Sequence, residues 1–318
     1  MGNEVMPWYV RAVIGLGAWI TAVVMIALGG VFVFSLLELD DPGALAVFGV
    51  VFFAFGLWLL RQEDSGVFAE QLGLATAAAG TAMIAGGIAA ESESLWVGFV
   101  VALILAGIVI TMCDDVILQF LCTALVAGFY FAGLMDERTP YFVDLAALTT
   151  PAGLLLMWRP AQRNLAPAAM ALLLAFPAIS VLVRDTLLGM RELTMGGTFA
   201  RSLHIVLFLG LAYLHWRQTA DESTRLQTVA FAMVAVVVCL LLPPGGSAAM
   251  LLLMLAFVIG SKPLAAIGAV LQAQFIIRYY YSLEMNLLDK SLLLMGVGLV
   301  LIAAWWFMHR LESRREGS

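Results

Sequence analysis

The side chains best suited to chemistry stand together near the C-terminal end, in a stretch that is otherwise apolar. Gln274 and Arg278 are four residues apart, so a helix places them on one face, and Tyr281 follows about one turn later. A guanidinium keeps its charge and needs acceptors, which predicts that this face points to protein or water, with Glu284 as a candidate partner. Such a face suits an internal ion pair or an anion site. Tyrosines and an arginine near a helix end are also typical of an interfacial belt, and both interpretations stay open.

A second candidate is the acidic pair Asp114 and Asp115, which directly follows Cys113 in a tight connection between two apolar runs. Two adjacent carboxylates at a membrane edge can bind a cation or relay protons, and they are also common as exposed acids in a turn. Asp144 opens another apolar run, where an acid complements the helix dipole. His204 stands near the start of a later one, and we interpret it as a hydrogen-bonded packing residue that could titrate near neutral pH.

No other pattern indicates a catalytic or metal centre. The three cysteines are interpreted as small hydrophobic residues, and the three histidines have no spacing suited to zinc or haem. The sequence also has no Gly-x-Ser-x-Gly elbow, no His-Glu-x-x-His pair and no phosphate-binding loop. We therefore predict no catalytic residue, no bound metal and no cofactor.

The elements that must position these residues are membrane-spanning helices. Hydrophobic residues make up 63% of the 318 residues and charged residues 12%, with a mean hydropathy of +1.01. No soluble core absorbs that much apolar surface, whereas a bilayer does when helices satisfy their own backbone. The fold class is therefore predicted as all-α, a polytopic transmembrane helix bundle of about twelve helices. The predicted spans are Ala12–Leu37, Pro42–Leu60, Gly66–Ala90, Leu95–Met112, Val116–Met135, Val143–Trp158, Leu165–Val183, Leu203–Trp216, Leu226–Leu242, Ser247–Ile259, Pro263–Tyr281 and Leu292–Met308. Ser247–Ile259 and Pro263–Tyr281 fit two crossings or one re-entrant hairpin.

The two halves of the chain resemble each other. Arg61-Gln62 follows one tryptophan-containing helix end, as Arg217-Gln218 follows another, and similar pairs recur at an offset near 150 residues. We interpret this as a duplication: residues 1–160 form a first six-helix unit and residues 161–318 a second, within one integral membrane domain. Six is even, so the repeats would run parallel, related by an axis along the membrane normal. Chance similarity among apolar segments is the alternative.

Charge sets the orientation and excludes one class of partner. Lys and Arg favour one side of the predicted topology by ten to six, which places both termini in the cytoplasm of a multi-pass protein of the cell inner (cytoplasmic) membrane. The net charge of −6 and the lack of a basic patch exclude nucleic acid as a partner. The expected partners are the lipid bilayer and other membrane proteins.

Both ends of the chain resemble one known family. Residues 7–11 (PWYVR), 15–19 (GLGAW) and 279–291 (YYYSLEMNLLDKS) are similar to the DUF4401 family of bacterial integral membrane proteins, and the resemblance covers essentially the whole chain. The family's function is unassigned, so it implies no catalytic residue. Its members resemble or accompany the DUF2157 and GDYXXLXY membrane proteins, which implies a partner.

Three functions compete on this basis. The first is a non-enzymatic subunit or scaffold of an envelope membrane assembly, favoured by short loops and few charges within the apolar runs. The second is a transporter or channel-like carrier with a polar site near Arg278. The third is an intramembrane enzyme, which only scattered acidic residues and His204 support.

Overall fold

The structure is a computed structural model, and it describes residues 8–36, 42–62, 66–139, 141–158, 165–186, 197–219 and 244–282, with isolated positions between 225 and 240 and between 288 and 299. These residues are helical and contain no strand, which confirms the all-α class. The chain divides into two compact units. Unit 1 comprises Met1–Thr139 and Ala152–Ala175, and unit 2 comprises Pro140–Pro151 and Phe176–Ser318.

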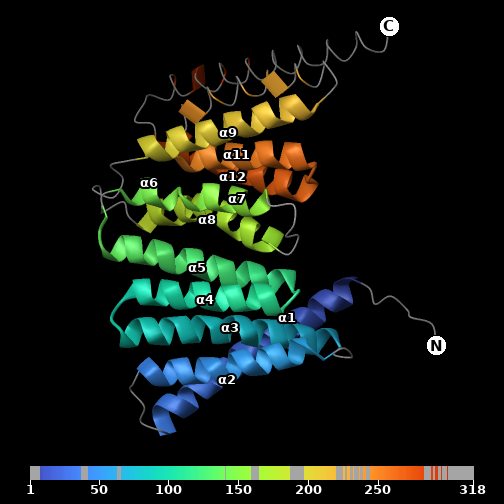
Figure 1. The fold of residues 1–318 in the computed structure, drawn as a ribbon, viewed down its shortest axis with the longest axis vertical. Coiled ribbons are helices and arrows are strands. Elements are labelled where there is room, and N and C mark those ends of the chain that lie inside the picture. Colours follow the sequence, from blue (N-terminus) through green and yellow to red (C-terminus); the bar gives the residue numbers. More distant parts are fainter. Residues whose placement is uncertain are drawn as a thin grey trace, which may run out of the picture. The chain divides into compact units, whose positions relative to one another are not determined.

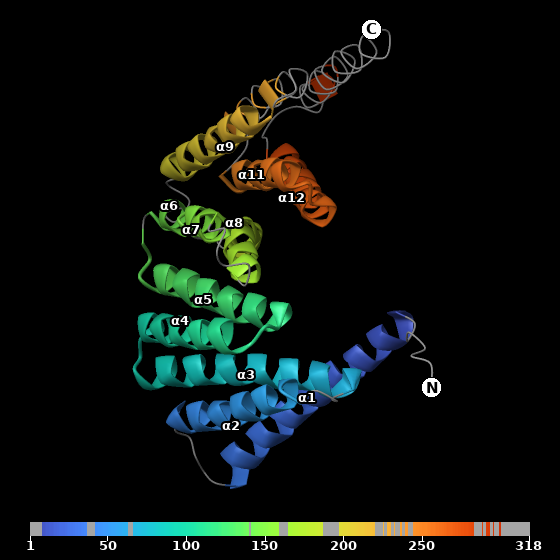
Figure 2. The same ribbon diagram turned by 45° about the vertical axis from the view of Figure 1, so that its right-hand side comes forward.

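Unit 1 is built mainly from five helices: α1 (Trp8–Leu36), α2 (Pro42–Leu60), α3 (Val67–Glu91), α4 (Leu95–Met112) and α5 (Val116–Asp136). The last four lie side by side in chain order, and α1 runs obliquely past α2 and packs against α3 (Figures 1 and 2). Helix α3 touches α1, α2, α4 and α5, and it is the most buried of the long apolar helices. It is therefore the central element of the unit.

Glycines bring α2 and α3 unusually close together. They recur every seven residues on both helices, at Gly49 and Gly56 on α2 and at Gly73, Gly80 and Gly87 on α3. An added Cβ at Gly56 would lie 2.4 Å from the backbone nitrogen of Ala77, and one at Gly80 would lie 2.4 Å from that of Phe53. Side chains of any size are excluded there. A period of seven keeps the small residues on one seam along both helices.

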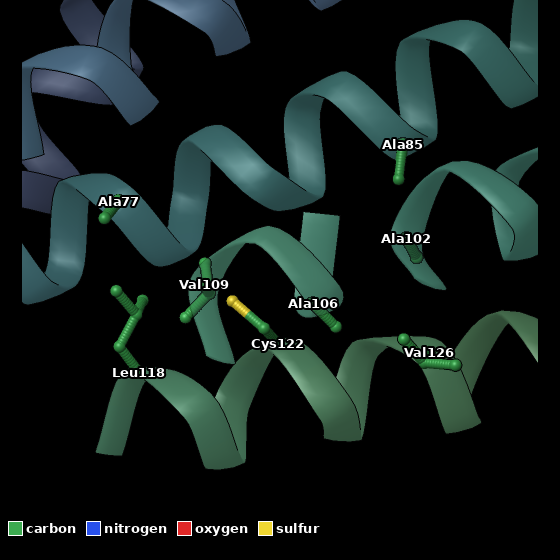
Figure 3. Packing of buried hydrophobic residues seen from close by; sticks show 8 residues of the cluster. All are labelled: Ala77, Ala85, Ala102, Ala106, Val109, Leu118, Cys122 and Val126. Carbon is green, nitrogen blue, oxygen red and sulfur yellow. The ribbon is translucent and has the colours of Figure 1, made fainter. Parts of the chain in front are cut away.

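The other side of α3 packs against α4 and α5 through small side chains. Ala77 and Ala85 face Ala102, Ala106 and Val109 of α4 together with three residues of α5, all of them buried; the three are Leu118, Cys122 and Val126. Figure 3 shows these side chains converging between the helices. Because most of them are no larger than valine, the three helices pack closely.

Unit 2 contains α6 (Phe142–Ala146), α9 (Thr198–Gln218), α11 (Pro244–Ile259) and α12 (Lys262–Ser282). Helices α7 (Thr149–Met157) and α8 (Ala166–Thr186) are divided between the units: α7 begins in unit 2 and α8 ends in it. Helix α11 packs against α9 and α12 and is buried over most of its length. It reverses into α12 at Gly260, whose φ of +73° favours glycine.

Among the described residues, five helices are long and apolar enough to cross a membrane: α2, α3, α4, α5 and α9. These helices indicate a multi-pass membrane protein. Two spans, Pro42–Leu60 and Leu95–Met112, are as predicted, and most others that the structure describes differ by a few residues at one or both ends. Leu226–Leu242 and Leu292–Met308 lie almost wholly outside the described residues. The helix count of twelve, the duplication and the orientation of the termini stay predictions.

One predicted span is wrong. Val143–Trp158 was expected as a single helix, but the described chain forms α6 and α7 with a turn at Ala147 and Leu148. Pro151 explains the break, because in a continuous helix it would have no N–H for the carbonyl of Ala147 and its ring would collide with that carbonyl. The Thr149 hydroxyl donates to the Ala146 carbonyl at 3.0 Å, which satisfies the end of α6.

Candidate functional site

The most polar place inside unit 2 surrounds His204. Its ring is fully buried on α9, with Nδ1 3.0 Å from the Ser247 hydroxyl of α11 and Nε2 3.3 Å from the Thr150 hydroxyl of α7. The Phe176 ring of α8 covers it at a centroid distance of 5.0 Å. One histidine therefore joins helices α7, α8, α9 and α11.

The hydrogen bonds determine where the ring proton lies. The Ser247 hydroxyl donates to the Pro244 carbonyl at 2.7 Å, so its oxygen is left to accept from Nδ1–H of His204. Nε2 then accepts from the Thr150 hydroxyl. A neutral imidazole satisfies both partners in this arrangement. The pair of Thr150 and His204 resembles a nucleophile beside a base, and Thr150 is only 2% exposed.

Asp144 has a role that its own helix does not reveal. Its Oδ1 accepts from the backbone N–H of Gly197 at 2.9 Å and of Ala200 at 2.8 Å, at the start of α9. Gly197 has φ +91° and no side chain, so Asp144 of α6 supplies the cap that α9 lacks. This cap explains why α9 begins at Thr198, five residues before the predicted start.

Arg278 binds a protein acceptor. It is half-buried on α12, and its Nη1 donates to the backbone carbonyl of Val181 on α8 at 2.6 Å. Gln274, one turn earlier, is also half-buried. Tyr281, about one turn after Arg278, is 76% exposed. The physical reason is that α11 begins opposite Phe275, and the last turns of α12 extend beyond it. Glu284 lies outside the described residues.

Three buried polar atoms in unit 2 have no partner in the described part of the chain. They are Nε of Arg201, one turn before His204, Nε2 of His215 near the end of α9, and Oε1 of Gln272 on α12, a residue that is 9% exposed. Buried polar atoms nearly always find a partner, so such atoms indicate water or a ligand. Unlike the polar groups around His204, these atoms form no hydrogen bond to a neighbouring helix among the described residues.

The acidic pair lies at the turn between α4 and α5 in unit 1. Asp115 caps α5, since its Oδ1 accepts from the Leu118 N–H at 2.7 Å, and Asp114 is exposed. Burial raises the pKa of the adjacent Cys113 thiol, while Arg61 works against this shift. Both aspartates belong to unit 1, whereas Arg278 belongs to unit 2. The candidate residues therefore form two groups, one in each unit.

Chemically, both groups are rich in hydroxyl, amide and carboxylate oxygens. The described residues contain no cluster of three His, Cys, Asp or Glu side chains that suits a metal ion. Thr150 and Ser247 were not predicted as site residues, because a single hydroxyl in an apolar segment does not indicate its partner. Their signals were the Thr149-Thr150-Pro151 sequence in an apolar run and the Gly245-Gly246-Ser247 sequence at a helix start.

Comparison with known protein families gives a match over most of the chain. The family model described as a domain of unknown function, DUF4401, matches residues 7–311. No curated protein matches the chain, and no solved structure matches it. The match covers nearly all of the 318 residues and confirms the resemblance seen at both ends. The chain belongs to the DUF4401 family.

Proposed function

We propose that this protein is a non-enzymatic subunit of a membrane assembly, which packs one face of α4 against a helix of another membrane protein. Helix α4 has two different faces. Ala102, Ala106 and Val109 are buried against α3 and α5. The opposite side, here called the α4 open face, consists of Val97, Val100, Leu103, Ile104 and Gly107.

The α4 open face is the observation that carries this proposal. Leu103 and Ile104 are 52% and 57% exposed, and a Cβ added at Gly107 would meet nothing within 4 Å. A glycine beside branched apolar side chains lets a second helix approach closely, which favours association within a bilayer. Lipid alone would also cover exposed leucine and isoleucine side chains, so the test must distinguish a partner helix from lipid.

The interior polar residues support a structural role. His204, Asp144 and Arg278 each bind groups on a different helix. In an apolar interior such bonds fix the arrangement of helices. A catalytic site would instead need these groups to be accessible to a substrate.

Photo-cross-linking in native membranes tests the proposal. A photoreactive amino acid at Leu103 or Ile104 should give a discrete adduct with one membrane protein, identified by mass spectrometry. The matched control is the same probe at Glu93, an exposed residue of the α3–α4 turn, which should not give that adduct. Adducts with lipid alone at Leu103 and Ile104 would refute the proposal.

A carrier is the second candidate, and one observation favours it. The unpartnered atoms of Arg201 and Gln272 lie in unit 2, which also contains α6 and the turn that separates it from α7. Interrupted helices and buried polar atoms are typical of transporter sites near the middle of the bilayer. Water access to the His204 cluster distinguishes the two functions, because a carrier needs a water-filled path to it and a packed subunit does not.

A further inference from the structure

The turn between α4 and α5 contains an amide oxygen that lacks a donor. Gln119 is only 2% exposed, and its Nε2 donates to the Cys113 carbonyl at 2.7 Å. Because a carbonyl oxygen can only accept, this bond identifies the atom next to Cys113 as the amide nitrogen, and it holds the Gln119 amide at the turn. Its Oε1 is buried and has no partner in the described part of the chain. A buried acceptor without a donor is costly, which indicates an additional ligand or water.

Two carboxylates stand at the same turn. Asp114 is exposed, and Asp115 is half-buried with only Oδ1 engaged, by the Leu118 N–H. Arg61 is near enough to act electrostatically on Cys113, yet within the described residues it forms no ion pair with either aspartate. The turn therefore offers carboxylate oxygens and one buried amide oxygen, all of them acceptors.

These acceptors select the class of ligand. Oxygen donors suit hard cations, and Mg²⁺ in particular binds through one or two carboxylates while it keeps several water molecules. A water molecule held by such an ion is a strong hydrogen-bond donor, which is what Gln119 Oε1 lacks. The absence of a three-residue metal cluster among the described residues agrees with a largely hydrated ion rather than a zinc-type site.

The geometry points to a site for a hydrated divalent cation of the Mg²⁺ class at the α4–α5 turn, held by Asp114 and Asp115, with a cation-bound water donating to Gln119. The site uses residues of unit 1 alone, and it does not depend on the proposed partner of α4. Binding would hold the end of α4 to the start of α5, and so stabilise the folded unit.

The test measures thermal unfolding of the purified full-length protein in detergent, with MgCl₂ titrated at constant ionic strength. We expect a saturable rise in the melting temperature that KCl does not give. Asp115→Asn keeps a good helix cap while removing the charge, and combined with Asp114→Asn it should weaken Mg²⁺ affinity by at least about tenfold. The control Asp136→Asn removes an exposed acid at the other end of α5 and should leave the affinity unchanged.

A direct measurement on the unmodified protein removes any dependence on how the variants fold. Electron paramagnetic resonance should show Mn²⁺ binding that Mg²⁺ displaces, and Gln119→Leu should reduce it. A melting temperature that responds equally to KCl and MgCl₂ would overturn the proposal. So would the loss of Mg²⁺ stabilisation in Asp136→Asn to the same degree as in the double variant.

Discussion

Gly80→Ala is expected to destabilise the protein, because α2 and α3 touch backbone to backbone. The added methyl would lie 2.4 Å from the Phe53 nitrogen, 2.7 Å from the Gly49 carbonyl oxygen and 2.8 Å from the Phe53 Cα. None of these atoms can rotate away, so the helices must separate by about 1 Å to reach an ordinary contact of 3.4 Å. Such overpacking costs up to about 3 kcal/mol. The better helix propensity of alanine offsets about 1 kcal/mol, which leaves a net loss of about 2 kcal/mol.

Gly86→Ala is the matched control on the same helix. A Cβ at Gly86 would meet nothing within 4 Å, so only the propensity gain of up to about 1 kcal/mol should remain. The free energy of unfolding of both variants can be measured by titrating a denaturing detergent into mixed micelles. Equal stability of the Gly80 and Gly86 variants would refute the close approach of α2 and α3.

Three further predictions concern other contacts. His204→Ala should lower the free energy of unfolding by about 3 kcal/mol, because it leaves a cavity and two hydroxyl groups without their partner; thermal melts would show it, and an unchanged melt would contradict the joining role. Asp144→Ala should cost about 1–2 kcal/mol and speed amide exchange in the first turn of α9, whereas wild-type exchange there would count against the cap. Cys113 should alkylate slowly at pH 7 and faster as the pH rises, because only the thiolate reacts and burial raises the pKa of this thiol. Arg61→Gln should slow the reaction further, since Arg61 lowers that pKa; a faster reaction measured by mass spectrometry would contradict this.

Hydropathy predicted the long helices of unit 1 well, because residues next to each helix end in the sequence determine where the helix begins and ends. Pro42 opens α2 and Arg61 follows its end, while Cys113 and the two aspartates that follow it separate α4 from α5. Apolar runs bounded by such residues leave little freedom for the ends of a span. The glycines spaced by seven residues along α2 and α3 are also visible in the sequence, but no contact between these helices was predicted from them.

The candidate site was less predictable, because its contacts join segments that are distant in sequence. The cap of α9 comes from Asp144, 53 residues before Gly197, and the partners of His204 lie 54 residues before it and 43 residues after it. No local pattern encodes such pairs. The break between α6 and α7 is different, because Pro151 indicates it locally. The length of the apolar run led to the prediction of one continuous helix in spite of this proline.

Water access to Ser247 tests the central claim most directly. Ser247→Cys, in a chain whose three natural cysteines are replaced by alanine, places a thiol of nearly the same size beside His204. If the protein is a packed subunit, this thiol should stay unlabelled by small, charged, water-soluble reagents in intact membranes, while Glu93→Cys in the exposed α3–α4 turn should be labelled. Labelling of Ser247→Cys to a similar extent would show a water-filled path to the cluster, contradict the structural role and favour a carrier.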